Sequence, residues 1–141
     1  MKVKVMKLDA GAKIPKYAKN GDAGMDLYAV SFSIDKHNNY VFGTGLAMEI
    51  PEGYVGLIFP RSSISKTAHS LRNAVGVIDS GYRGELIFKF DINTHNSPVY
   101  EIGDRIGQII IMPYPKIEFE EAWELSKTQR GTGGFGSSGT N

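Results

Sequence analysis

The chain has 141 residues, of which 41% are hydrophobic and 22% charged, and its formal net charge is +1. This balance is typical of one globular domain, and the near-zero charge excludes a general attraction to nucleic acid or to a membrane surface. The chain has no cysteine, which excludes disulfides and thiolate metal sites. No apolar run approaches membrane-spanning length and the start is no secretory signal, so we expect a cytoplasmic protein without nucleic-acid or membrane partners.

Short runs of β-branched and aromatic residues follow one another along the chain, bounded by glycine, proline, asparagine or aspartate. The runs at 3–5, 54–59, 86–92 and 105–112 are predicted strands, because their residues alternate between apolar and polar or form a brief apolar stretch. Turns are predicted at 19–21, 51–53 and 102–104, each of which contains a glycine. The pattern predicts an all-β fold, a jelly roll or distorted β-barrel.

Two segments are less regular. Residues 62–71 lack glycine and proline and begin with serines that suit a helix N-cap, so they could form a helix. Residues 117–130 also lack helix breakers. Phe119 and Trp123 have helical spacing, whereas Ile117 and Phe119 alternate with glutamates as in a strand, so both interpretations stay open.

The carboxyl-terminal segment from Arg130 to Asn141 is rich in glycine. It cannot order itself, because glycine loses the most backbone entropy and has no side chain to bury. Its backbone N–H groups could nevertheless converge on an anion, Arg130 could fork onto phosphate oxygens, and Phe135 could stack on a base. The segment could therefore close over a nucleotide, although most glycine- and serine-rich ends are simply disordered.

A turn with one carboxylate follows the apolar run at 75–78. Asp79 leaves the core beside apolar residues, which makes it a candidate general base for a water molecule. Taken alone, such a segment is more often a turn whose aspartate hydrogen-bonds its own backbone. Tyr82, three residues later, could flank a sugar ring or be a half-buried aromatic residue.

A second block, at 60–63, suits a phosphate. Arg61, Ser62 and Ser63 follow Pro60 at a predicted helix N-terminus, where free N–H groups, hydroxyls and a guanidinium can bind an anion. An N-cap beside a surface arginine is the commoner explanation of this pattern in isolation.

Two carboxylates and one amide complete the candidate residues. Asp22 and Asp26 lie on either side of a glycine and could hold Mg²⁺ through water, or belong to an ordinary turn. Gln108 shares a predicted strand face with isoleucines, so its amide must find a partner or point into a pocket.

The order of these blocks is more specific than any one of them. The segments DAGMDLYA (22–29), PRSS (60–63), NAVGVIDSGY (73–82), GDRIGQ (103–108) and RGTGGFGSSG (130–139) resemble the five ordered motifs of the homotrimeric dUTPase family. The resemblance spans nearly the whole chain. It implies a β jelly-roll domain at 1–125, a flexible tail at 126–141 that closes over the nucleotide, and a homotrimer with sites shared between subunits.

The resemblance also implies an activity, the hydrolysis of dUTP to dUMP and pyrophosphate aided by Mg²⁺. This reaction limits uracil incorporation into DNA and supplies dUMP for dTMP synthesis. Carried over by position, Asp79 would activate the water that attacks the α-phosphorus, and Tyr82 would pack on the deoxyribose. Asn73, with backbone groups near Gly76 and Val77, would read the edge of uracil.

The remaining expected contacts divide by ligand. Mg²⁺ would be held mainly by the substrate's phosphates, with Asp26 and Asp22 contacting its bound water. Phe135 would stack on uracil. The other substrate contacts would come from Arg61, Ser62, Ser63, Gln108, Arg130, Gly136, Ser137 and Ser138.

Two alternatives remain. A dCTP deaminase shares the fold, but that activity is expected to need a glutamate just after the aromatic residue of the Asp79 turn, where this chain has Arg83. A non-catalytic, nucleotide-dependent binding module is the other. Asp79 and the complete tail favour catalysis. Ser63 and Met25 stand where many family members have glycine and an aromatic residue.

Overall fold

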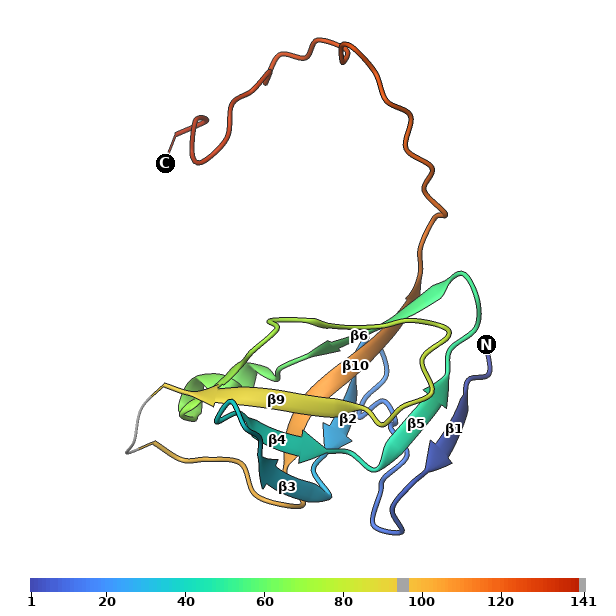
Figure 1. Cartoon of the computed structure of the whole chain (residues 1–141), viewed down its shortest axis with the longest axis vertical. Helices are drawn as coiled ribbons and strands as arrows, with labels where there is room; N and C mark the ends of the chain where they lie inside the picture. The colour runs from blue at the N-terminus through green and yellow to red at the C-terminus, as the bar shows by residue number, and fades with distance from the viewer. Residues whose placement is uncertain (94–96, 140–141) are drawn as a thin grey trace.

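The structure is a computed structural model, and it describes residues 1–93 and 97–139. The last two residues of the predicted tail, 140–141, lie outside the described residues. Regular structure is almost entirely β (Figure 1). In chain order the elements are β1 (Lys4–Lys7), β2 (Met25–Tyr28), β3 (Ser31–Ile34), β4 (Tyr40–Gly43), β5 (Leu46–Glu49), β6 (Tyr54–Phe59), the 3-10 helix η1 (Ser62–Lys66), β7 (His69–Leu71), β8 (Gly76–Ile78), β9 (Ile87–Ile92) and β10 (Arg105–Pro113).

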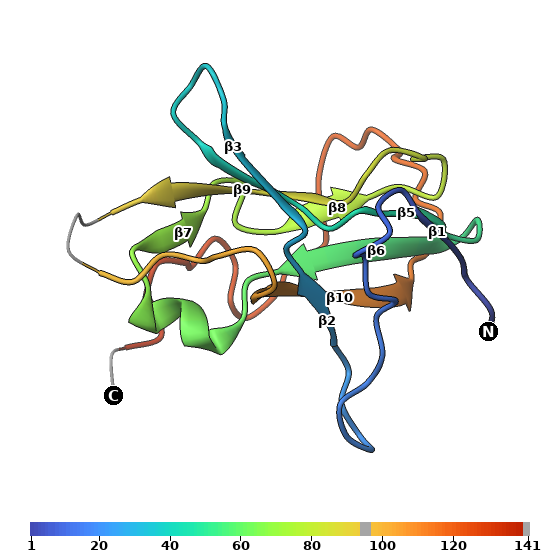
Figure 2. The same cartoon turned by 90° about the horizontal axis from the view of Figure 1, so that it is seen from below.

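The strands form two four-stranded antiparallel sheets and a two-stranded ribbon. One sheet has the order β2-β10-β6-β8, the other has the order β3-β4-β9-β7, and β1 pairs with β5. Apolar side chains of both large sheets meet in one core, for example Leu27 and Ile109 from the first and Phe42 from the second. Figure 2 shows β9 and β10 in different layers. The predicted all-β fold of jelly-roll type is confirmed.

The alternation at 86–92 produces one buried and one outward face on β9. Phe88 and Phe90 are 0% exposed, while Lys89 between them faces solvent. A Cβ atom at Gly107 of β10 would collide with the ring of Phe88, so this position needs glycine. The β10–β2 register shifts between Arg105 and Gly107, and this irregularity precedes Gln108.

The predicted turns are confirmed by their backbone. Gly21, Gly53 and Gly103 all have a positive φ, of 89°, 82° and 96°, a conformation that glycine adopts without steric cost. The helix predicted for 62–71 is wrong in its extent, because only Ser62–Lys66 form η1. The chain then becomes extended, since the backbone of Ala68 bonds to that of Pro98 and Asn93 and the following residues pair with β9.

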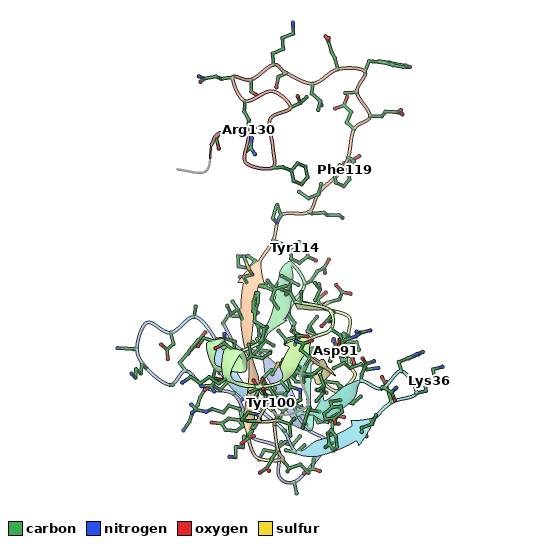
Figure 3. All side chains as sticks on the ribbon, turned by 90° about the vertical axis from the view of Figure 1, so that its left-hand side faces the viewer. Lys36, Asp91, Tyr100, Tyr114, Phe119 and Arg130 are labelled. Atoms are coloured by element: carbon green, nitrogen blue, oxygen red, sulfur yellow. The ribbon has the colours of Figure 1, made fainter. Side chains whose placement is uncertain are left out.

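Neither interpretation of residues 117–130 is correct. The chain leaves the sheet after β10 and runs away from the domain without helix or strand (Figures 1 and 3). Phe119 and Trp123 are 94% and 106% exposed, so neither periodicity has a surface of this chain to pack on. The predicted division into a β domain at 1–125 and a tail at 126–141 that closes over the nucleotide stays a prediction. Within the described ranges, no helix is long and apolar enough to cross a membrane.

Candidate active site

Three of the sequence blocks meet at one end of the β2-β10-β6 sheet. The Cα atom of Gln108 in β10 is paired with that of Asp26 in β2 and with that of Phe59 in β6. Because β6 ends at Phe59, Arg61 begins the next segment beside the same strand end. The Gln108 amide finds a partner, donating from Nε2 to the Pro60 carbonyl oxygen at 3.3 Å. Residues far apart in sequence therefore form one polar cluster.

The carboxylate of Asp26 lies between two guanidinium groups. Arg61 Nε donates to Oδ1 at 3.0 Å, and Arg105 Nη1 donates to Oδ2 at 3.3 Å. Arg61 Nη1 also donates to Ser63 Oγ at 3.2 Å, and Ser62 begins η1 with an exposed side chain. The sequence analysis missed Arg105, although it lies inside the GDRIGQ segment.

This arginine cluster borders an open cavity of about 410 Å³. Arg61, Ser63, Lys66 and Arg105 line it, together with Asp104. Three cations line the cavity against one carboxylate, and Asp26, which pairs with the two arginines, is not among the lining residues. Such an excess of positive charge with hydroxyls favours an anion that carries several oxygens, such as a polyphosphate.

A buried aromatic pair lies near this cluster. His69 is 4% exposed, its ring stacks on that of Tyr100 at 4.8 Å, and its Nε2 accepts the Tyr100 backbone N–H at 2.9 Å. Burial lowers the pKa of His69 below its usual value. Burial also raises the pKa of Tyr100, against an opposing effect of the Arg61 charge. No motif signalled this pair, because neither residue has a diagnostic sequence neighbour.

The second group of candidate residues surrounds β8. Gly76 is buried, and a Cβ atom there would collide with Ile58 of β6. Val77 is 63% exposed and lies on the outer face of the strand. Asn73 is exposed just before β8, and its Nδ2 lies 3.6 Å from the position of such a Cβ at Gly76. The uracil-reading role that the resemblance implies for these residues stays a prediction.

The turn after β8 presents an unpaired carboxylate. The backbone carbonyl of Asp79 accepts the Tyr82 N–H at 3.1 Å, so the main chain closes the turn. The Asp79 side chain is exposed and makes no hydrogen bond or ion pair with the described part of the chain. The Asp79 carboxylate therefore does not hydrogen-bond its own turn, which was the alternative interpretation of the sequence.

Tyr82 forms one wall of a small cavity beside Asp79. Its hydroxyl donates to the Glu85 carbonyl oxygen at 2.9 Å, and its side chain remains 43% exposed. The cavity is about 140 Å³ and is also lined by Val77 and Ile87. Glu85 also lines the cavity, but its carboxylate accepts the Gly45 N–H at 2.7 Å, which leaves Asp79 as the unpaired carboxylate. Such a cavity can hold a ring next to a reacting group.

The two groups lie at opposite ends of the β6–β8 strand pair. The antiparallel register pairs Gly56 with Ile78 and Ile58 with Gly76. Asp79 therefore emerges beside the start of β6, whereas Arg61 follows its end. The six residues between these points span about 20 Å of extended chain. In one chain, the two groups of candidate residues are therefore far apart.

The tail residues lie away from both groups (Figures 1 and 3). Arg130 Nε donates to the Gly133 carbonyl oxygen at 2.8 Å, and Phe135 is 113% exposed. The neighbouring candidates Gly136, Ser137 and Ser138 are exposed as well. Within the described part of this single chain, the tail side chains are not brought to the other candidate residues.

The two candidate metal-contacting carboxylates are already engaged in protein contacts. Asp22 Oδ2 accepts the Lys19 backbone N–H at 2.8 Å, and Asp26 is shared by the two arginines. Among residues 1–93 and 97–139, no group of three or more histidines and acids could enclose a metal ion. A cation here would take most of its ligands from water and a bound anion, which is how Mg²⁺ commonly binds with nucleotides.

Residues 10–139 match the family described as dUTPase. The chain belongs to the dUTPase family. A relative from Hydrogenobaculum sp. is 42% identical over 142 residues, covering 99% of both chains. A Corynebacterium glutamicum relative is 39% identical over 140 residues, covering 97% of this chain and 94% of its own. Both are named deoxyuridine 5'-triphosphate nucleotidohydrolase.

Solved dUTPase structures share the fold. The Staphylococcus bacteriophage 80alpha dUTPase with dUPNHPP has a TM-score of 0.83 and 30% identity, with 99% of each chain covered. A mutant dUTPase from phage phi11 of S. aureus, described with a structural Mg(II) ion, has a TM-score of 0.74 and 28% identity, covering 88% of this chain and 98% of that one. The dUTPase family predicted from the five ordered segments is confirmed.

Proposed function

We propose that this chain hydrolyses dUTP to dUMP and pyrophosphate through Mg²⁺-assisted attack of water on the α-phosphorus. The exposed carboxylate of Asp79 carries the proposal. It has no partner in the described part of the chain and lies at the rim of the cavity beside Tyr82. A carboxylate so placed can orient a water molecule and take its proton as the oxygen attacks.

The segment formed by β8 and the turn that follows it supplies the selection of base and sugar. Asn73 and the backbone near Gly76 and Val77 would hydrogen-bond the edge of uracil, and a base with other donors would leave buried polar groups unpaired. The Tyr82 ring is held by its hydrogen bond to the Glu85 carbonyl. Packed against deoxyribose, it would leave no space for a 2′-hydroxyl.

The arginine cluster would bind the phosphates. Arg61, Ser62, Ser63 and Gln108 provide a guanidinium, hydroxyls and an amide at one strand end, and phosphoryl transfer depends mainly on such positioning and charge neutralisation. The tail would then close on the nucleotide, with Phe135 on uracil and further contacts from Arg130, Gly136, Ser137 and Ser138. Closure at residues 126–141 would exclude bulk water from the reaction.

More than one chain is needed to assemble this site. Asp79 and Arg61 lie about 20 Å apart along one strand pair, and the tail points away from both. The segment before the tail also exposes Ile117, Phe119 and Trp123, at 61%, 94% and 106%, side chains that another copy could cover. We therefore propose a homotrimer in which each site takes residues from more than one subunit.

The carboxylates fit a water-mediated contact to Mg²⁺ better than direct ligation. Asp26 already accepts two N–H groups, and its remaining lone pairs can accept hydrogen bonds from water. Asp22 is placed similarly near the surface. When bound through the substrate's phosphates, Mg²⁺ would neutralise part of their negative charge.

In the cell, this reaction would limit uracil incorporation into DNA and supply dUMP for dTMP synthesis. We place the protein in the cytoplasm, where deoxynucleotides are made. A deaminase is disfavoured by Arg83, whose guanidinium donates to the backbone carbonyls of Ser80 and Tyr82, because the glutamate expected for that chemistry is missing.

The decisive experiment is pyrophosphate release from dUTP with Mg²⁺, beside dCTP, dTTP and UTP. Release from dUTP alone would support the enzyme and both its base and sugar selection. Nucleotide binding without turnover in the folded protein would favour the non-catalytic binding module. Ammonia release from dCTP would favour the deaminase.

A further inference from the structure

Arg61 is held by two hydrogen bonds before any ligand binds. Its Nε donates to Asp26 and its Nη1 to Ser63, and its side chain is only 25% exposed. These contacts leave the Nη2 amino group without a partner in the described part of the chain. The guanidinium is therefore held by two contacts yet keeps donors available, and Arg61 lines the cavity.

The arrangement around Asp26 differs from a forked ion pair. In a fork, one arginine gives two N–H groups to one carboxylate. Here each oxygen of Asp26 takes one N–H from a different arginine, at 3.0 Å from Arg61 and 3.3 Å from Arg105. A second cation on Oδ2 fixes the plane of the carboxylate, and that plane in turn fixes the Nε–H of Arg61.

We propose that Asp26 and Arg105 are positioning residues that hold Arg61 in its phosphate-binding orientation. This inference rests on the proposed phosphate-binding role of Arg61. An arginine without such support has many rotamers and would lose that freedom on binding, whereas a guanidinium that is already fixed loses less. Arg105 belongs to this arrangement because its link to Asp26 joins β10 to β2, across the strand pair that also carries Gln108.

The charges around Asp26 support positioning over metal ligation. Both carboxylate oxygens face a guanidinium, so a divalent cation bound directly to either oxygen would lie beside Arg61 or Arg105 and be repelled. A water-mediated contact to Mg²⁺ remains compatible with this geometry. The two roles predict different responses to Mg²⁺ concentration, which makes them separable.

The test measures kcat and KM for dUTP over a series of Mg²⁺ concentrations in Asp26→Asn and Arg105→Gln. We expect kcat/KM to fall at least about tenfold in both variants at saturating Mg²⁺, because a misplaced binding group is costly even when it is present. Arg105→Lys should recover most of the loss, because Arg105 contributes one N–H and a positive charge. The double variant Asp26→Asn with Arg61→Gln should have the same kcat/KM as Arg61→Gln alone, because Asp26 is proposed to act through Arg61.

The matched control is Arg72→Gln. Arg72 Nη1 lies 3.2 Å from Asp91 Oδ2, and both side chains are about half exposed, in the other large sheet. We expect its kcat/KM to equal that of the wild type. Thermal melting of each variant reports whether it is folded, and the exposed Arg105 position provides the test if Asp26→Asn does not fold.

Three results would overturn the proposal. The first is an unchanged kcat/KM in Arg105→Gln, and the second is a defect of Asp26→Asn that excess Mg²⁺ abolishes. The third is a double variant of Asp26 and Arg61 whose loss of kcat/KM equals the two single losses combined. If the wild-type protein releases no pyrophosphate from dUTP, the proposed function has failed instead. In that case, calorimetry measures the affinity of the same variants for inorganic pyrophosphate. At least about tenfold weaker binding in both would support positioning, and unchanged binding would refute it.

Discussion

Asp79 emerges beside the start of β6 and Arg61 follows its end, so the two side chains lie at opposite ends of one antiparallel strand pair. We therefore expect the proposed base and the phosphate-binding arginine of one site to come from different chains. This relationship makes the assembly of the site testable without a structure of the complex.

Mixing two inactive proteins should restore activity. Asp79→Asn and Arg61→Gln are each expected to lose hydrolysis, but a mixed trimer contains some sites with an intact Asp79 from one chain and an intact Arg61 from another. Equal mixing followed by subunit exchange should recover about a quarter of wild-type activity, because random assembly completes about a quarter of the sites. Exchange confirmed by native mass spectrometry without any recovery would place both residues in one chain's site.

The Asp79→Asn variant should bind substrate but scarcely turn it over. The amide keeps the shape of the side chain and cannot take a proton, so kcat should fall about 10²- to 10⁴-fold. Binding of a non-hydrolysable dUTP analogue, measured by calorimetry, should stay near the wild-type value. The control is Asp91→Asn, at another exposed carboxylate. If the two variants have the same kcat, Asp79 is not the catalytic base.

Deletion of residues 130–141 should leave the domain folded and cripple turnover. The segment extends away from the domain (Figure 1), so its removal breaks no core contact. Circular dichroism should give an unchanged melting temperature, while dUTP hydrolysis should be largely lost. Phe135→Ala should show a milder loss with a raised KM, because only the base-stacking surface is removed. A deletion variant that no longer assembles would instead show a structural role.

Acid should destabilise the protein through His69. Burial lowers the folded-state pKa of this histidine below the unfolded value, so the unfolded chain takes up a proton first as pH falls. This destabilising effect of His69 is absent at neutral pH and begins as pH falls through about 6.5, where the unfolded chain binds the proton. The free energy of unfolding then decreases by at most about 1.4 kcal/mol for each pH unit.

Urea unfolding at pH 7.5 and 5.5 measures this effect against His69→Gln. The glutamine can still accept the Tyr100 N–H through its amide oxygen, but it does not titrate. We expect the wild type to lose more stability between the two pH values than the variant does. Parallel losses in the two proteins would assign the acid sensitivity to other groups.

Local sequence was sufficient for the strands predicted at 3–5, 54–59, 86–92 and 105–112 and for the three predicted turns, but it gave no prediction for β3, β4 and β5. The alternation at 86–92 matches β9, in which Phe88 and Phe90 are buried, because a strand's side chains alternate between faces whatever their long-range partners. Gly21, Gly53 and Gly103 occupy the positive-φ positions that their turn signals require. The candidate residues at 73–82 also lie near one another, since they belong to one short strand and the turns beside it.

Local sequence was insufficient wherever a distant segment decided the conformation. Residues 62–71 look helical but form only a short 3-10 helix, because β9 pairs with the strand that follows. Residues 117–130 carry both helical and strand spacing, yet Phe119 and Trp123 are almost completely exposed in the described part of the chain. Spacing also gave no sign that Arg105 and Arg61 share Asp26, since β2, β6 and β10 meet only after folding.

The sequence by itself determined the all-β character, the order of the five segments and hence the family, because these depend on residues close together along the chain. Only the tertiary structure decided which of those segments meet. It joined Asp26, Arg61 and Gln108 at one strand end and placed Asp79 at the other. The physical reason is that the antiparallel register between strands sets these distances, and that register depends on core packing between residues far apart in the chain.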